Sequence, residues 1–360
     1  MFVFDVSREW VILSSAAART GADEIAQYLY RLRSRAGLSM GPPPVEDAAG
    51  PAPADPVPLI VLNGGETGGG RIRNGFSWRL GTDRLEIYGD SDRGLLNGVF
   101  DFLDALGIRW PAPDREELPP PPAKKTPQAA GNYPLARDKA YSPSAASPRE
   151  LRRLFAGGKK KTKNRGELFR WAARNKIDVA VLSLKDRSLR IPAGSGAAAK
   201  KSPLKTAEQY ALILEAGGWD LSLLVPRRLF PFRRELFRME SGKRTPRFNF
   251  CPTNPETIAL LKKEARRIFR AVLDGFPEIQ IWHLWPDRGH EKTWCSCPAC
   301  RAFSAEDQNR IAVNAVADVL AELAPRARLS LPEPAAEQEP GDGISLRPNI
   351  FCLKGLPPEA

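Results

Sequence analysis

The chain contains 360 residues, of which 42% are hydrophobic and 27% are charged. This length suffices for two cores, and this composition excludes a disordered or fibrous chain. No apolar run reaches the ~18 residues that a membrane span requires, so no membrane partner is expected. The net charge is +12, but the basic runs at Gly157–Arg165 and Lys200–Lys205 contain no aromatic residues that could stack on bases. Nucleic acid is therefore not an expected partner.

The N-terminal residues alternate like a strand and show no basic lead followed by an apolar core, so we find no signal peptide. The chain has five cysteines, three of which lie too close together in sequence to pair easily with one another. Both observations favour reduced thiols and a cytoplasmic location. The sequence carries no indication of an oligomeric state.

Residues 1–115 are predicted to form a small α/β sandwich domain. Helices are expected from about Thr20 to Gly37 and over residues 91–107, where apolar residues recur on one face and a glycine ends the helix. The expected strands are Phe2–Val6 or Trp10–Leu13, Val57–Leu62, Phe76–Leu80 and Arg84–Tyr88. Residues 116–134 are rich in proline and predict a linker.

From residue 135 to residue 360, short apolar strands alternate with helices, which is typical of parallel βα units. One of the expected helices spans Lys205–Gly218. The six expected strands lie near residues 134–140, 177–184, 219–226, 278–286, 326–332 and 349–355. Six strands in one row favour a (β/α) barrel over an open sheet. Because a TIM-type barrel closes with eight strands, we predict a barrel that is incomplete at its C-terminal side.

Several segments resemble known families. DSDRGLLNGVFDFLDALGIRWPAP (residues 90–113) is similar to the end of the small α/β domain that precedes the barrel in α-glucuronidases and family 20 glycoside hydrolases. FNFCPTNPETI, WPDRGHEKTWCSCPACRAFS and RIAVNAVADVLAELAPRARLSL resemble the bacterial domain-of-unknown-function 4838 proteins, which place a cysteine-rich loop after a barrel strand. The resemblance implies a TIM barrel with a glycosidase-like role.

The cysteine-rich loop is the strongest candidate for a metal site. Cys295, Cys297 and Cys300 follow the spacing C-x-C-x-x-C, and thiolates so close together can converge on one cation, as structural zinc requires. Cys251 is the expected fourth ligand, and the two histidines of the chain are alternatives. Two other interpretations stay open: reduced thiols that pack as small hydrophobic groups, and a redox pair at CPAC before a helix. No organic cofactor is expected.

In a barrel of this kind, functional residues follow the C-terminal ends of the strands. Glycoside hydrolysis needs one carboxyl group to protonate the leaving oxygen and a second to act as nucleophile or to activate water. Asp287, after the fourth strand, is the preferred catalytic candidate, and Glu333, after the fifth, is its expected partner. Asp186 and Glu291 are further carboxylates near this edge. The alternative role for Asp287 is a turn residue after Pro286.

Four side chains near this edge are candidates for contact with a substrate. Trp285 and Trp294 offer flat apolar faces to a sugar ring, and His283 is expected in the wall of the site. Because alternate residues of a strand point to opposite sides, at least one tryptophan is expected to be core packing. Arg227, after the third strand, could grip a uronic-acid carboxylate through its guanidinium fork, or lie on a loop surface.

These features predict a carbohydrate-active protein of the glycoside-hydrolase type that acts on or binds a glycan containing a uronic acid or a hexosamine. The alternative is a catalytically inactive glycan-binding or degenerate scaffold protein, because the predicted barrel is incomplete. A basic nucleic-acid binder is the least favoured function.

Overall fold

The computed structural model describes residues 2–51, 57–64, 74–121, 132–135, 138–141, 153–155, 165–185, 205–218, 221–287, 293–332 and 344–353. Contacts divide the chain into two compact units. The first comprises Met1–Arg153, Thr162–Val179 and Ser202–Ile213, and the second comprises Leu154–Lys161, Ala180–Lys201 and Leu214–Ala360. Among the described residues, no helix combines the length and the apolar character of a membrane span.

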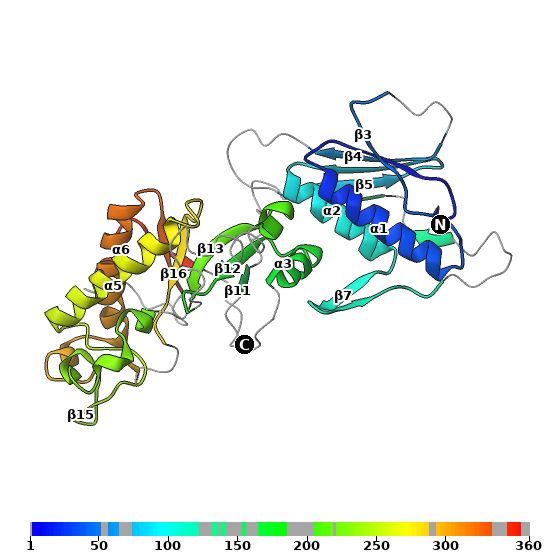
Figure 1. Cartoon of the computed structure of the whole chain (residues 1–360). Coiled ribbons are helices and arrows are strands. Elements are labelled where there is room, and N and C mark those ends of the chain that lie inside the picture. Colours follow the sequence, from blue (N-terminus) through cyan, green and yellow to red (C-terminus); the bar gives the residue numbers. More distant parts are fainter. Residues whose placement is uncertain are drawn as a thin grey trace. The chain divides into compact units, whose positions relative to one another are not determined.

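The first unit is an α/β domain around a mixed six-stranded sheet. Its elements are β1 Phe2–Asp5, β2 Val11–Ser14, α1 Arg19–Arg35, β3 Val45–Asp47, β4 Leu59–Gly64, β5 Phe76–Leu80, β6 Arg84–Gly89, α2 Asp92–Ala105, β7 Arg109–Ala112, β8 Arg115–Glu117, β9 Asn132–Leu135, β10 Asp138–Tyr141 and α3 Arg165–Arg174. The strand order is β10-β5-β6-β4-β2-β3, and β3, β2, β4 and β6 are parallel. Helices α1 and α2 lie against one face of this sheet (Figure 1).

Helix α2 forms where the sequence supplies both a cap and an apolar face. Ser91 Oγ accepts a hydrogen bond from the backbone N–H of Gly94 at 3.0 Å, which is the N-cap arrangement that serine favours. Leu95, Val99 and Phe102 are buried; Val99 lies beside Gly21 of α1, and Phe102 packs edge to face against Trp78 of β5. The small α/β domain expected from the sequence is thus present.

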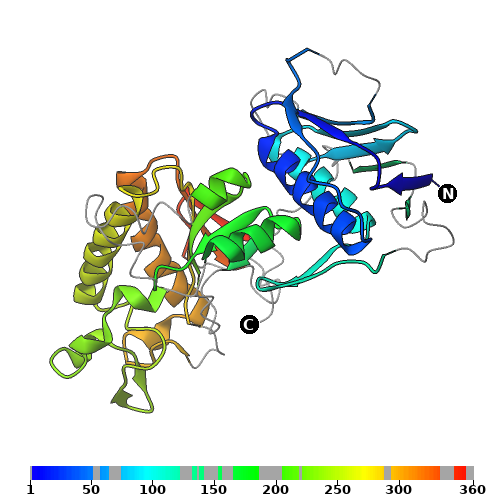
Figure 2. The ribbon, with the colours of Figure 1, turned by 45° about the vertical axis from the view of Figure 1, so that its right-hand side comes forward.

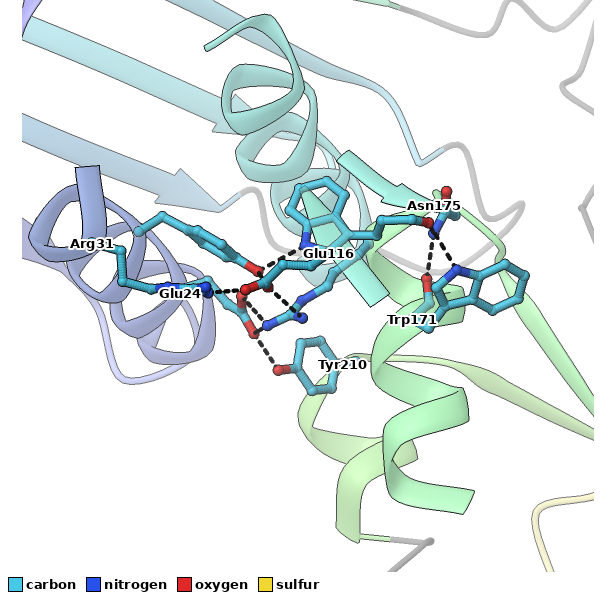
Figure 3. A network of polar contacts seen from close by, with 9 residues as sticks. Glu24, Arg31, Glu116, Trp171, Asn175 and Tyr210 are labelled. Atoms are coloured by element: carbon cyan, nitrogen blue, oxygen red, sulfur yellow. Dashed lines mark hydrogen bonds and ion pairs between the residues drawn. The ribbon is translucent and has the colours of Figure 1, made fainter. Parts of the chain in front are cut away.

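A buried polar network holds helix α3 within the first unit (Figure 3). Glu24 of α1 accepts hydrogen bonds from Arg174 at 3.0 Å and from the hydroxyl group of Tyr210. The Arg174 guanidinium also lies 3.7 Å from Glu116 of β8. The indole N–H of Trp171 donates to a backbone carbonyl of β7 at 2.9 Å. Because these charges are buried and paired, they fix α3 against α1 and the β7–β8 hairpin.

The second unit contains a curled, parallel, six-stranded half-barrel. Its elements are β11 Arg153–Phe155, β12 Val179–Leu182, β13 Ile213–Gly218, β14 Met239–Glu240, β15 Lys243–Arg244, α5 Pro255–Leu273, β16 Ile281–Leu284, α6 Ala305–Leu323, β17 Arg328–Pro332 and β18 Ile350–Leu353. The strand order is β11-β12-β13-β16-β17-β18. Helices α5 and α6 pack side by side (Figure 2). The expectation of an incomplete barrel after a small α/β domain is confirmed.

Three individual predictions are wrong. The strand expected near residues 134–140 contributes β9 and β10, which pair with β1 and β5 of the first unit. The helix expected over Lys205–Gly218 gives way to β13, because Ala211 adopts a left-handed conformation with φ 48° that interrupts the helix. The strand expected near residues 219–226 is instead a 3-10 helix over Leu221–Leu224. Short apolar runs fit a buried strand and a buried helix equally well.

Gly217 permits the close approach of β13 to β16. Its φ is +113°, and a Cβ atom at this position would lie 1.7 Å from the backbone oxygen of His283. Only glycine fits both the conformation and the space. The glycine therefore determines how closely β13 can pair with β16.

Candidate functional site

Asp287 lies at the edge where the parallel strands end. It follows β16 by three residues, and 25% of its side chain is exposed. Its Oδ2 lies 3.3 Å from Nη2 of Arg227, and its backbone N–H donates to Oδ1 of Asn249 at 2.9 Å. Separate partners therefore hold the carboxylate and the main chain of Asp287.

Arg227 is the positive partner at this edge. Its Nη2 also donates to the backbone carbonyl of Phe248, whereas its Nη1 is buried and has no hydrogen-bond partner within the described part of the chain. Burial lowers the pKa of Arg227; Asp287 opposes this shift and Arg238 adds to it. The Nη1 nitrogen lies beside the ion pair but is not exposed at the surface.

Asn249 connects Asp287 to the cysteine-rich loop. The asparagine is fully buried, and its Nδ2 lies 3.3 Å from both the backbone oxygen and Oγ1 of Thr293. The preceding residue, Phe248, has φ 61°, a left-handed conformation that bulky residues rarely adopt. Our sequence analysis missed Asn249; its signal was a polar residue between two phenylalanines.

A buried polar group lies across three neighbouring strands of the half-barrel. His283 of β16 has Nε2 2.8 Å from Oε2 of Glu215 on β13 and Nδ1 2.5 Å from Oγ of Ser330 on β17. The indole N–H of Trp285 donates to both oxygens of Ser330, at 3.0 and 3.1 Å. Glu215 was missed because the segment was expected to be a helix. Its signal was a single carboxylate inside the apolar run LILEAGG.

Trp285 and Trp294, expected to face a sugar, are only 1% and 6% exposed. Trp294 packs edge-on against Phe250 with ring centroids 5.8 Å apart. Trp282, on the opposite side of β16, packs against Phe269 of α5 at 4.7 Å. Trp285, Trp294 and His283 are therefore buried, and their contact with a substrate stays a prediction.

Four residues considered for the site lie outside the described residues: Glu333, Asp186, Glu291 and His290. Among the candidates that are described, the structure brings Asp287 together with Arg227. The pairing of Asp287 with Glu333 stays a prediction.

The four cysteines expected to bind metal converge. The sulfur atoms of Cys251, Cys295, Cys297 and Cys300 lie within 4.8 Å of one another, and all four residues are buried. Cys251 Sγ is 3.8 Å from Cys297 Sγ and 3.7 Å from Cys300 Sγ. Sulfur ligands at the usual zinc–sulfur distance of about 2.3 Å are about 3.8 Å apart in a regular tetrahedron. Two of the sulfur–sulfur distances therefore match those of a tetrahedral thiolate site.

Hydrogen-bond donors surround the sulfur atoms. The backbone N–H of Met239 donates to Cys295 Sγ at 3.2 Å, and Arg244 Nη1 lies 3.7 Å from the same atom. Thr253 Oγ1 lies 3.0 Å from Cys300 Sγ. Donors and a positive charge stabilise thiolates rather than thiols.

Three of the thiols, those of Cys251, Cys295 and Cys300, also control one another's protonation. Hydrogen bonds to Cys295 and Cys300 hold the pKa of Cys251 far below its usual range, whereas the bond to Cys251 raises the pKa of Cys295 to about 11 and raises that of Cys300 further. Four cysteine sulfur atoms at these distances can all be thiolates only if a cation lies among them. The buried four-cysteine cluster could therefore bind a metal ion.

Comparisons with known proteins identify the fold. No family model matches the chain, and no curated protein matches it. Three solved structures are similar: the Flavobacterium johnsoniae chitobiase of glycoside hydrolase family 20 (TM-score 0.55, 15% identity, 92% of this chain and 50% of that chain), the family 20 exo-β-N-acetylglucosaminidase from Vibrio harveyi with N-acetylglucosamine (0.56, 14%, 98% and 54%), and the β-N-acetylhexosaminidase from Bacteroides fragilis (0.53, 14%, 98% and 67%).

This likeness shows the fold, and the chain spans about half the length of the first two structures. The resemblance of residues 90–113 to a family 20 domain agrees with it. The resemblance to the domain-of-unknown-function 4838 proteins stays a prediction.

Proposed function

We propose that this protein acts on or binds a glycan in the manner of a glycoside hydrolase, at the edge marked by Asp287 and Arg227. The observation that carries the proposal is this ion pair, whose carboxylate follows β16 of a half-barrel similar in fold to family 20 structures. Functional side chains gather at this edge in βα barrels.

Asp287 is the candidate for the carboxyl group that protonates the leaving oxygen or stabilises positive charge on the sugar, and Glu333 is the candidate second carboxyl group. Two substrate classes have support. A hexosamine is favoured by the similar N-acetylglucosaminidase and hexosaminidase structures. A uronic acid is favoured by the guanidinium of Arg227, whose side chain is 36% exposed beside Asp287.

Chromogenic aryl N-acetyl-β-glucosaminides and aryl glucuronides test the proposal. Asp287→Asn is expected to lower kcat by roughly 10²–10⁴-fold, because the loss of a general acid has that effect. Asp274→Asn, at the exposed end of α5, is the matched control and is expected to retain the activity. No turnover of any glycoside, or full activity of Asp287→Asn, would contradict a hydrolytic role.

A catalytically inactive glycan-binding protein is the second candidate. Among the described residues that directly follow the strands of the half-barrel, Asp287 is the one carboxylate. Hydrolysis by the usual route needs two. Calorimetric titration with N-acetylglucosamine oligomers and with glucuronic acid distinguishes the candidates, since binding without turnover selects the second.

We also propose that the four cysteines bind one structural zinc ion. Support comes from the sulfur separations and from the all-thiolate set, which suits zinc. Elemental analysis is expected to find about one zinc per chain, lost in Cys297→Ser. Cys352→Ser, which changes the exposed cysteine outside the cluster, is expected to retain it. A folded wild-type chain without metal would refute the site.

A further inference from the structure

We infer that a metal ion bound by the cysteine cluster sets the position of Asp287, and that Asn249 transmits this effect. A catalytic role for Asp287 rests on the proposed function, but this coupling between the metal and Asp287 does not. Asn249 lies two residues before Cys251, and Thr293 lies two residues before Cys295. Asn249 Nδ2 lies within hydrogen-bond distance of Thr293, 3.3 Å from both of its oxygens. Two residues span at most about 7 Å, so this contact joins two segments immediately beside their metal ligands.

Aromatic packing couples the same two segments. Phe250 lies between Asn249 and Cys251, and Trp294 lies between Thr293 and Cys295. The two rings are buried and meet edge to face at 5.8 Å. Because protein interiors are close-packed, a cysteine that moves displaces these rings and the residues beyond them.

The other end of the Asn249 amide supports the edge of the half-barrel. Oδ1 accepts the backbone N–H of Asp287 at 2.9 Å, so the fully buried amide cannot turn without losing this bond. Phe248, the residue before it, offers its carbonyl to Arg227, the ion-pair partner of Asp287. Residues 248–249 therefore hold both members of the ion pair.

The left-handed conformation of Phe248 shows that this segment depends on its surroundings. A bulky residue keeps such a conformation only where neighbouring structure holds it. A cation bound by Cys251 and by the three cysteines after Thr293 would keep Phe248 in this conformation. Protonated thiols in the same places make only weak hydrogen bonds, so metal loss is expected to release residues 248–251 and 293–297.

Hydrogen exchange at the Asp287 amide tests the coupling in the full chain. Cys297→Ser is expected to lose the metal and to raise this exchange roughly tenfold, because the N–H loses an ordered acceptor. Exchange in β2 and β4 of the first unit is expected to stay unchanged. Cys352→Ser is the matched control and is expected to change neither metal content nor exchange. An unchanged Asp287 amide in a folded, metal-free variant overturns the inference, as does a wild-type chain without metal.

Asn249→Ala keeps all four cysteines and provides an independent test, needed if Cys297→Ser fails to fold. This variant is expected to retain one metal ion per chain while the exchange of the Asp287 amide rises roughly tenfold. Unchanged exchange would refute the positioning role of Asn249. Loss of the metal with increased exchange throughout the second unit would show a general structural role and would also overturn it.

The exchange measurement is independent of any glycan. If the wild type neither binds nor hydrolyses glycans but the exchange responds as expected, the proposed function fails and the coupling stands. If glycosides are turned over but the exchange does not respond to metal loss, the coupling alone fails.

Discussion

His283 Nε2 lies 2.8 Å from Oε2 of Glu215, and both side chains are buried between adjacent parallel strands of the half-barrel. Nδ1 of the same ring contacts Ser330 on the next strand at 2.5 Å. The imidazole of His283 thus links β16 to β13 through Glu215 and to β17 through Ser330. A buried carboxylate is tolerated here because the imidazole partners it.

Glu215→Ala is expected to lower the free energy of unfolding by about 3 kcal/mol, because it removes one partner of a buried polar pair. Urea denaturation followed by tryptophan fluorescence measures the change. Glu278→Ala is the control, because Glu278 is exposed just before β16, and its effect is expected within about 0.5 kcal/mol. Equal stability of the two variants would show that the pair contributes nothing.

Gly217→Ala is expected to prevent folding of the second unit or to cost more than about 4 kcal/mol, because the new Cβ would collide with the backbone of β16. Gly242→Ala is the matched control. Gly242 also has a positive φ, +78°, but no atom lies within 4 Å of its Cβ position. Its cost is expected to be about 1 kcal/mol, from backbone strain alone. Circular dichroism and thermal unfolding compare the two, and a well-folded Gly217→Ala would contradict the close strand approach.

Arg174→Met is expected to destabilise the first unit by about 3 kcal/mol, because it leaves the buried carboxylate of Glu24 without its cation. Glu116 keeps its ion pair with Arg31 (Figure 3). The Arg174 side chain is only 12% exposed. Arg170→Met, one turn earlier on the exposed face of α3, is the control and is expected to have little effect. Thermal unfolding at equal protein concentration compares the two variants. Equal melting temperatures would contradict the prediction.

Asp101→Asn is expected to destabilise the first unit at pH 7 by about 1–2 kcal/mol, since Lys139 is half exposed and water screens part of the attraction. Burial alone would raise the pKa of Asp101, but hydrogen bonds from Lys176, Lys139 and Trp78 outweigh it and lower the pKa. The folded-state pKa therefore lies below the unfolded value, so this stabilisation is present above about pH 4. It is lost as the pH falls through the folded-state pKa.

Urea denaturation at pH 7 and pH 3 checks this sign. The difference in the free energy of unfolding between the wild type and Asp101→Asn is expected to be smaller at pH 3 than at pH 7. Asp104→Asn is the control, because Asp104 is exposed three residues later on the same helix and pairs only with exposed Arg109 in the described structure. A difference that widens on acidification would contradict the assignment.

Local signals predicted part of this structure well. Apolar periodicity and a closing glycine predicted the helices that are α1 and α2, because both signals lie within a helix or one turn of its end. The close spacing of Cys295, Cys297 and Cys300 likewise indicated convergent thiols. Such features involve neighbours in sequence, so pattern and chemistry can be evaluated together.

Long-range contacts were harder to predict. Cys251 competed with both histidines as the fourth ligand until the fold placed its sulfur 3.8 Å from that of Cys297. Glu215 and Asn249 were missed, since nothing adjacent in sequence reveals that a strand or a loop carries them to His283 and Asp287.

The residues alone predicted the α/β domain, the incomplete barrel and three of the four clustered cysteines, because periodicity and close spacing are local properties of a chain. The tertiary structure decided which side chains meet across β13, β16 and β17 and which segment carries the fourth sulfur. Those meetings depend on strand register and on the left-handed turn at Ala211, where an apolar run that could continue a helix instead becomes a strand.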